Sequence, residues 1–471
     1  MIKTETKKQC GIHLKGTSKY SFAAILHCLL PHLLGSNAGQ NPILLALFAF
    51  KLRQNPTQSC VPLVFRGALK TKVFRCILIV VIFIFLGCKR ESVSYNNREE
   101  TQQNNFENSF ALQKQDEALQ KHAADIVNNM SDAALCAQLI MSGIDSRGAL
   151  NGMEAERLKD MQCGAIMLFG KNLNTSAENI KVMTNDIYLQ YTDVLPFIAL
   201  DEEGGLVHRL PEGLPVLPPP LSYYQKWQQA HTNEKGTSSA LNEINTDAQS
   251  MAKALSALGI NMNLAPIAEV LTVANNDFLQ TRSYGYDSQF VSDACTTFIQ
   301  AMQNNKVVCV IKHFPGNSLA DPHFDKPVLN GTVSEIETYT KSFKQIISGG
   351  NVYAVMISHV IVPAWDADNN CSLSKIVINE KLRGDFNFSG IVIADDFAMA
   401  AVADIYGLEE SAVKAVDAGV DMLMAWPATL YTTHNALLKA LKNKTLAKKR
   451  LQEAARRIVY EKLRFGLVTN E

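Results

Sequence analysis

The chain has 471 residues, of which 47% are hydrophobic and 19% are charged, so most of it is expected to fold around a large core. The net charge of zero hides an asymmetry: residues 1–88 hold eleven Lys and Arg and one acid, and the remainder holds 34 Lys and Arg against 44 acids. An acidic body gives no support for nucleic-acid binding, which depends on a basic surface.

The first distinct pattern in chain order is an eleven-residue apolar run at 76–86, which follows a basic flank and ends at Gly87-Cys88. This arrangement is typical of a secretory signal, and a membrane-spanning helix needs about 20 apolar residues. The ending resembles a bacterial lipobox, in which Cys88 is lipidated and becomes the mature N-terminus. The alternative for residues 66–88 is an uncleaved membrane anchor. Both interpretations attach the protein to a membrane in the bacterial cell envelope, with its body outside the cytoplasm.

The segments on either side of this run show no domain pattern. We expect residues 1–65 to be an N-terminal extension that is not translated, with the true start at a non-Met codon near residues 63–73. Residues 89–115 are rich in Asn, Gln, Ser and Glu, which is typical of a solvated linker.

Residues 116–471 alternate short apolar runs with amphipathic helical patterns, the last of them at 451–467, and we expect no second domain after it. Eight runs are predicted to be strands: 138–142, 164–169, 197–200, 261–265, 307–311, 354–357, 391–394 and 422–424. Apolar strands separated by helices, such as those predicted at 246–258, 288–303 and 409–418, indicate a parallel sheet covered on both faces. Eight such units predict an α/β fold of the (β/α)8 TIM-barrel type with a single catalytic domain. A Rossmann fold is the main alternative, but no G-x-G-x-x-G follows any strand.

Five cysteines lie in this body, widely spaced and without a CxxC pair. We interpret them as buried core residues rather than as a zinc or redox site. The sequence shows no metal-ligand cluster, so neither a metal nor another cofactor is expected.

Polar residues follow four of the predicted strands: Asp201-Glu202-Glu203, Lys312-His313, Ser358-His359 and Asp395-Asp396. In a parallel barrel the carboxyl ends of all strands meet at one mouth, where active sites lie. The acids gathered there indicate chemistry on a neutral polyol.

Six sequence blocks now point to a known family. They are LDEEGGLVHRL (200–210), GINMNLAPIAEV (259–270), TRSYG (281–285), IKHFPG (311–316), MISHVIVPAWD (356–366) and IVIADDFAM (391–399). In content and order they resemble glycoside hydrolase family 3, and most closely its single-domain β-N-acetylglucosaminidase branch, over about residues 130–467.

The resemblance implies that Asp395 is the catalytic nucleophile. A carboxylate below the anomeric carbon can form a glycosyl ester and stabilise an oxocarbenium-like transition state. Asp396 is expected to cap the next helix or to brace the site. The alternative for both acids is a solvated loop or a helix cap.

The resemblance also implies an acid/base dyad, Asp321 and His323, on the loop after the fifth strand. A histidine exchanges protons near neutral pH, and a neighbouring carboxylate can orient its ring. The alternative for His323 is an exposed surface group. The family usually reaches the dyad six residues after KHFPG, whereas residues 317–320 supply only four. We expect the shorter loop to restrict the swing of His323.

Sugar contacts carry over by the same resemblance, with a structural ion pair as the alternative for each. Asp201 resembles the acid that grips the distal hydroxyls of the terminal sugar. The other residues expected to bind substrate are Arg209, Arg282, Lys312, His313 and His359. His359 is equally compatible with a structural role, and Leu206 replaces the first Arg of the family's EGGRVxR pattern.

The predicted function is a retaining exo-glycosidase, a β-N-acetylhexosaminidase that acts through a covalent glycosyl-Asp intermediate. Its carbohydrate substrate would be terminal β-linked N-acetylglucosamine on oligosaccharides or on cell-wall fragments, as in peptidoglycan turnover. Three alternatives stay open: a β-glucosidase of the same family, a glycoside phosphorylase, and a weakly active sugar-binding lipoprotein at the cell surface.

Overall fold

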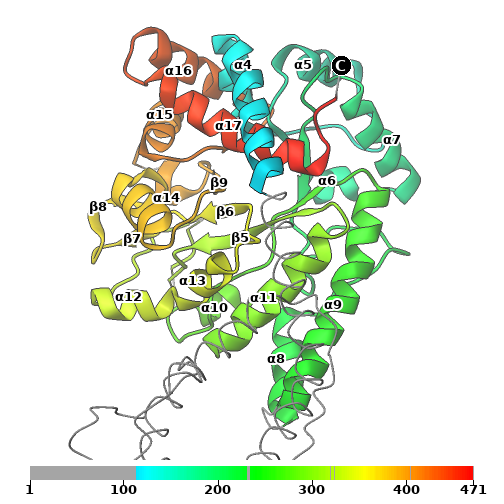
Figure 1. The fold of residues 1–471 in the computed structure, drawn as a ribbon, viewed down its shortest axis with the longest axis vertical. Helices are drawn as coiled ribbons and strands as arrows, with labels where there is room; N and C mark the ends of the chain where they lie inside the picture. Colours follow the sequence, from blue (N-terminus) through cyan, green and yellow to red (C-terminus); the bar gives the residue numbers. More distant parts are fainter. Residues whose placement is uncertain (1–112, 231–233, 319, 323, 404, 470–471) are drawn as a thin grey trace, which may run out of the picture. The chain divides into compact units, whose positions relative to one another are not determined.

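The structure is a computed structural model that describes residues 113–230, 234–318, 320–322, 324–403 and 405–469 (Figure 1). The predicted extension, the signal or anchor segment with Cys88, and nearly all of the linker at 89–115 lie outside the described residues. Among the helices that the structure does describe, none is both long enough and apolar enough to cross a membrane.

The body is built around eight parallel strands. They are β1 (Ile140–Gly143), β2 (Ala165–Met167), β3 (Phe197–Leu200), β4 (Met262–Asn263), β5 (Val308–Phe314), β6 (Ala354–Ile357), β9 (Ile391–Ala394) and β10 (Leu423–Ala425). They pair in the order β10-β1-β2-β3-β4-β5-β6-β9. A single parallel bridge between Ile393 and Met422 joins the two ends of this order. The sheet is therefore a nearly closed barrel, and the predicted (β/α)8 fold is confirmed.

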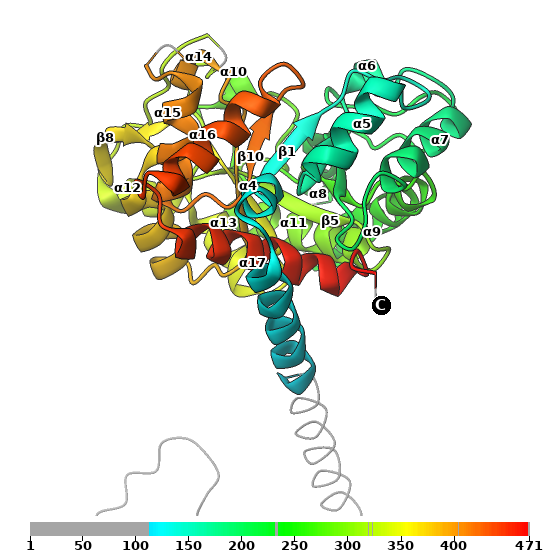
Figure 2. The same ribbon diagram turned by 90° about the horizontal axis from the view of Figure 1, so that it is seen from above.

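Helices surround the strands (Figures 1 and 2). Those on the chain before β6 are α4 (Asp132–Gln138), α5 (Gly152–Met161), α6 (Gly170–Leu173), α7 (Ala177–Tyr188), α8 (Pro220–Gln229), α9 (Glu234–Ala257), α10 (Asn276–Leu279), α11 (Ser288–Gln303), α12 (Val333–Tyr339) and α13 (Lys341–Ser348). Those after it are a 3-10 turn (Cys371–Leu373), a π-helix (Ile376–Asp385), α14 (Ala400–Ala403), α15 (Leu408–Ala418), α16 (Leu430–Lys442) and α17 (Lys448–Phe465). The side chains of Ser131, Asn151, Ser176 and Asp287 each accept a backbone N–H at a helix start, because such short polar side chains satisfy the free donors there. A small hairpin, β7 (Ile361–Val362) with β8 (Asp366–Asn370), lies between β6 and the π-helix.

The sequence located all eight strands, and three of them, β3, β6 and β9, have the predicted bounds. One placement was wrong. Lys312 and His313 were expected after the fifth strand, but β5 continues through both residues to Phe314. Polar side chains normally end an apolar strand pattern, but here both are buried and paired with carboxylates inside the barrel mouth.

The core has two layers, as expected for a barrel. Side chains such as Met141, Met167 and Val310 fill the barrel interior, and a larger cluster lies between the strands and the helices. The five cysteines of the body are free and buried, so the prediction that they are core residues is confirmed.

Residues 113–129 form a helix that crosses α17 and projects from the barrel on the side away from the short helices that follow β2, β4 and β9 (Figure 2). The hydroxyl of Tyr460 donates to Asp116, and the side-chain amide of Gln452 donates to Asn128 over 3.3 Å. The first described segment therefore joins the barrel at the amino ends of its strands.

Candidate active site

An ion cluster occupies the β3–β5 side of the barrel mouth. The Nζ atom of Lys312 lies 2.5 Å from Oδ1 of Asp201 and 2.6 Å from Oε1 of Glu203. Arg282 donates from Nε and Nη2 to the two oxygens of Glu203, at 2.8 Å and 2.9 Å. The structure thus brings together three of the predicted sugar contacts, Asp201, Arg282 and Lys312, and it joins them through Glu203.

Electrostatics keep this cluster ionised despite its burial. Burial alone would raise the pKa of Glu203, but the charges of Lys312 and Arg282 outweigh it and bring that pKa to about 2. The two acids, Asp201 and Glu203, likewise overcome burial and raise the pKa of Lys312. Of the two carboxylates, Asp201 is the more accessible, with 22% of its side chain exposed against 2% for Glu203. Asp201 is therefore the member best placed to meet a ligand.

A second network fixes His313 and the start of the loop after β5. The buried carboxylate of Glu269 lies 2.8 Å from Nδ1 of His313 and accepts from the backbone N–H of Asn317 over 2.6 Å. The side-chain amide of Asn317 donates to the same carboxylate over 2.9 Å. A proton on Nδ1 of His313 satisfies this contact, and the tautomer assigned in this way makes Nε2 a hydrogen-bond acceptor.

Tyr339 closes the turn that follows His313. Its hydroxyl donates to the backbone carbonyl of Asn317 over 3.0 Å. Gly316 has φ +145°, and a Cβ atom there would lie 2.0 Å from Cε1 of Tyr339, so only glycine fits. Sequence reasoning missed Glu269 and Tyr339 as parts of the site. Glu269 stands inside one of the six sequence blocks, which was the available signal, whereas Tyr339 lies in an ordinary helical pattern.

Asp395 and Asp396 follow β9 at the same mouth, and both are half-buried. The backbone N–H of Asp396 donates to Oδ1 of Asp395 over 2.9 Å. The carboxylate of Asp396 accepts from the indole N–H of Trp426 and from the backbone N–H of Ala398, each over 2.9 Å. Burial raises the pKa of Asp396 in spite of these two donors. Asp396 is thus held by the protein, and sequence reasoning did not find its partner Trp426.

His359 does not offer a hydrogen-bonding atom to a ligand. Its Nδ1 lies 2.7 Å from the hydroxyl of Ser372, and its Nε2 lies 3.1 Å from the backbone carbonyl of Asp396. Burial lowers its pKa, although Asp395 acts in the opposite direction. This geometry favours the structural alternative for His359, because both ring nitrogens contact protein atoms and brace the turn at Asp396.

Arg209 lies on the β2–β3 side of the mouth. Its backbone N–H donates over 2.8 Å to the buried carboxylate of Glu202, which also contacts His208. Its Cδ atom is 4.0 Å from the position that a Cβ atom on Gly170 would take. The side chain of Leu206 is 59% exposed on the same loop, where the family pattern has an arginine. Arg209 therefore lies near the start of α6, and the apolar side chain of Leu206 is exposed on the same loop.

The dyad loop reaches the segment that follows Asp395. The backbone carbonyl of Asp321 accepts from Phe324 and Asp325, which forms a turn, and the carbonyl of Pro322 accepts from the N–H of Ala401 over 3.2 Å. Ala401 belongs to α14, which begins five residues after Asp395. His323 lies outside the described residues, so its position stays a prediction, but its chain neighbours lie beside the segment that follows the candidate nucleophile.

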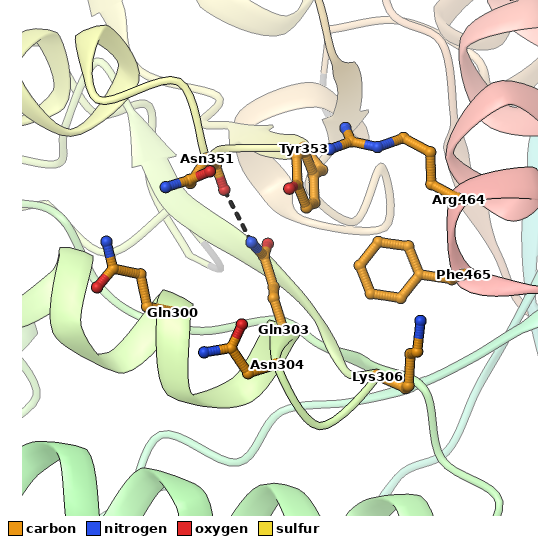
Figure 3. A pocket seen from close by; sticks show the side chains of 8 residues that line it. All are labelled: Gln300, Gln303, Asn304, Lys306, Asn351, Tyr353, Arg464 and Phe465. Carbon is orange, nitrogen blue, oxygen red and sulfur yellow. Dashed lines mark hydrogen bonds between the residues drawn. The ribbon is translucent and has the colours of Figure 1, made fainter. Parts of the chain in front are cut away.

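Two cavities lie outside this group of residues. One, of about 230 Å³, is at the amino ends of β5 and β6, opposite the mouth, where Gln303 donates to the carbonyl of Asn351 and Arg464 stacks on Tyr353 (Figure 3). Active sites of parallel barrels lie at the carboxyl ends of the strands, so this cavity is not the candidate active site. The other, of about 510 Å³, is lined by Leu221, Asn276, Asp277, Gln280 and Thr281, next to Arg282.

A parallel barrel whose strand ends gather carboxylates, lysine, arginine and histidine at one mouth has the architecture of a TIM-barrel enzyme. A model of the glycosyl hydrolase family 3 N-terminal domain matches residues 134–460. The chain is 31% identical over 287 residues to a beta-hexosaminidase of Tolumonas auensis, a match that covers 60% of this chain and 81% of that protein. A beta-hexosaminidase of Neisseria meningitidis is 29% identical, with 58% and 73% covered. This chain belongs to glycosyl hydrolase family 3.

A solved structure agrees with this assignment. A family 3 beta-N-acetylglucosaminidase from Paenibacillus sp. FPU-7 superposes with a TM-score of 0.65 at 25% identity. The match covers 73% of this chain, which spans 64% of the length of the Paenibacillus chain.

Proposed function

We propose that the protein is a β-N-acetylhexosaminidase that releases terminal β-linked N-acetylglucosamine with retention of anomeric configuration. The proposal is supported most by the position of Asp395, a half-buried carboxylate at the end of β9 that shares one mouth with the Asp201–Lys312 pair. Both relatives described above carry the name beta-hexosaminidase, and this chain belongs to their family.

In the proposed reaction, the ion cluster holds the sugar and Asp395 attacks it. Asp201, with Lys312 and Arg282 behind it, grips distal hydroxyls, and Nε2 of His313 supplies a further polar contact. This grip places the anomeric carbon over Asp395. Its carboxylate forms a glycosyl ester while the bond to the leaving oxygen breaks.

The proposed acid/base is His323 with Asp321 as its partner. His323 gives its proton to the leaving oxygen in the first step and takes a proton from water in the second, when water cleaves the ester and frees Asp395. The contact between Pro322 and Ala401 supports this assignment, because it keeps the loop beside the segment that follows Asp395.

Paired assays test the reaction and its alternatives. We expect the purified protein to turn over a nitrophenyl N-acetylglucosaminide much faster than the nitrophenyl glucoside. Phosphate should not change either rate. Preference for the glucoside supports the β-glucosidase alternative, and dependence on phosphate supports the phosphorylase. Asp395→Asn should lower kcat by at least about 10³-fold, since the ester can no longer form. If the wild-type protein binds N-acetylglucosamine without any turnover, it is instead a sugar-binding protein.

The proposed acid/base has its own test. His323→Ala should slow hydrolysis of a disaccharide, whose leaving group needs a proton, by about 10² to 10⁴-fold. It should affect a nitrophenyl substrate much less, and azide should accelerate the variant by replacing water in the second step. Equal turnover of the disaccharide by wild type and variant would remove His323 from the mechanism.

We further propose that cell-wall fragments are the natural substrate and that the protein is attached to the cell envelope through Cys88 or an uncleaved anchor. The basic and apolar pattern before Gly87 supports the attachment. Fractionation of cells that express the wild-type chain or Cys88→Ser tests it. Release of only the variant from the membrane fraction supports lipidation, and retention of both supports an anchor.

A further inference from the structure

An aromatic pair that plays no part in the proposed mechanism lies at the mouth beside the nucleophile. Phe169 follows β2 and Trp426 follows β10, and their rings stack with centroids 4.5 Å apart at an interplanar angle of 27°. Both side chains are half-buried rather than enclosed in the core. Because β10, β1 and β2 are neighbours in the barrel, the two rings lie together above the end of β1.

The glycine that ends β1 lies next to both rings of this pair. A Cβ atom on Gly143 would lie 3.4 Å from Cε3 of Trp426 and 3.7 Å from Cε2 of Phe169. The two rings therefore lie close to the end of β1 at the barrel mouth.

Both ends of the pair meet residues of the candidate active site. On one side, the indole N–H of Trp426 donates to Asp396 over 2.9 Å, one residue from Asp395. On the other side, Arg209 lies beside Gly170, the residue that follows Phe169. The pair thus extends from the nucleophile to the arginine of the β3 loop.

The mouth consequently has a charged side and an aromatic side. Asp201, Lys312 and Arg282 occupy the ends of β3 to β5 and the loop that follows β4, and they suit hydroxyl groups. The aromatic pair occupies the opposite side, on β10 to β2, and offers an apolar surface.

In the proposed reaction, the charged side holds the distal hydroxyls of the sugar and the anomeric carbon lies over Asp395. The second carbon is bonded to the anomeric carbon, so its substituent lies next to the nucleophile. In an N-acetylamino sugar this substituent ends in a methyl group, whereas in a glucoside it is a hydroxyl. An aromatic face stabilises a buried methyl group and gives a hydroxyl no partner.

We propose that the Phe169–Trp426 pair receives the 2-acetamido group and sets the preference for N-acetylamino sugars over plain glucosides. The proposal rests on the proposed function and names the residues that determine its specificity. Trp426 has a second role here as a positioning residue for Asp396.

Substitutions separate these two roles. Phe169→Leu and Trp426→Leu should each lower the ratio of kcat/KM for the nitrophenyl N-acetylglucosaminide to that for the glucoside by about 10- to 100-fold, the range of discrimination that an apolar pocket provides. Trp426→Phe keeps an aromatic face but loses the N–H, so it should lower kcat for both substrates and leave the ratio within about threefold.

Another stacked Trp–Phe pair provides a matched control. Trp227 stacks on Phe290 with centroids 4.7 Å apart and an interplanar angle of 26°, and its indole N–H donates to the hydroxyl of Thr237 over 2.7 Å. This pair lies between α8 and α11, away from Asp395. Trp227→Leu should therefore leave the ratio of kcat/KM unchanged.

The outcomes distinguish the inference from the proposed function. If the wild type prefers the N-acetylglucosaminide and both Leu variants retain that preference, the inference is wrong and the proposed function stands. If the wild type does not cleave the N-acetylglucosaminide, the proposed function fails. For a variant too slow to assay, calorimetry measures the relative affinity of the folded protein for N-acetylglucosamine and glucose, and circular dichroism verifies folding.

Discussion

The Nζ atom of Lys312 lies 2.6 Å from Oε1 of Glu203, and their side chains are only 3% and 2% exposed. Glu203 also holds Arg282 through both of its oxygens, so one carboxylate connects Lys312 with Arg282. Removal of one member of a buried ion pair leaves an uncompensated charge. The geometry of the sugar-binding side therefore depends on a residue that the sugar itself need not touch.

The first prediction concerns stability. Glu203→Gln should lower the free energy of unfolding by about 3–5 kcal/mol, because it leaves Lys312 and Arg282 without their shared charge. Asp201→Asn should have a smaller effect on stability, since Asp201 is 22% exposed and Lys312 keeps Glu203, but it should raise KM. Urea unfolding of both variants measures the difference. Equal destabilisation by the two changes would contradict the central position of Glu203.

The second prediction concerns acid. The pKa of Glu203 in the folded protein, about 2, is below its ordinary value of 4.5, so its ion pairs stabilise the fold fully above about pH 4.5. As pH falls from 4.5 towards 2, this contribution of about 3 kcal/mol is lost. The free energy of unfolding should therefore decrease more steeply over this interval in the wild type than in Glu203→Gln. Parallel pH profiles for the two proteins would show that Glu203 titrates normally.

The third prediction concerns the dyad loop. Ala401→Pro removes the N–H that donates to Pro322, at a first-turn position of α14 where proline is tolerated. One hydrogen bond contributes a net stabilisation of about 0.5–1.5 kcal/mol, so its loss should decrease kcat about two- to tenfold and change KM little. Ala401→Ser keeps the N–H and serves as the control. A wild-type kcat in the proline variant would show that the loop does not depend on this contact.

The fourth prediction concerns Lys462, which is fully buried and donates to Oε1 of Gln138 over 3.0 Å. Burial lowers its pKa from 10.5 to about 7, so the folded protein disfavours the charged form. The buried lysine therefore destabilises the folded protein little above pH 10.5. This destabilisation grows as pH falls from 10.5 to 7 and is constant below pH 7. Lys462→Met should therefore raise Tm, and by more at pH 7 than at pH 9.5.

A surface lysine on the same helix supplies the control for this measurement. The side chain of Lys449 is 86% exposed, so Lys449→Met should change Tm little and equally at both pH values. If Lys462→Met instead lowers Tm by the same amount at pH 7 and pH 9.5, the hydrogen bond to Gln138 stabilises the fold by more than burial of the charge destabilises it.

The barrel could be predicted from the sequence because its strands are buried on both faces. Such strands appear as continuous apolar runs, and 197–200, 354–357 and 391–394 were predicted with the bounds of β3, β6 and β9. The apolar pattern did not predict that β5 includes Lys312 and His313. Such a pattern cannot show that a polar residue inside a strand has a buried carboxylate partner from the segment after another strand.

The same limit applies to the site. Asp201, Lys312 and Asp395 were proposed as site residues because they belong to sequence blocks of the family. Their hydrogen-bonded pairing could not be derived from the sequence: Trp426 and Asp396 are 30 residues apart in the chain, and Lys312 and Asp201 are 111 apart, so only the folded barrel brings each pair together. His359 shows the converse, because its place after a strand suggested a ligand contact and its neighbours use both ring nitrogens.

The helix of residues 113–129 crosses α17 and projects from the barrel on the side away from the short helices that follow β2, β4 and β9 (Figure 2). The described chain therefore begins on the face of the barrel opposite the candidate active site, and coupling at that end leaves the mouth open to small soluble fragments. Immobilisation through the amino terminus should therefore preserve activity on such fragments.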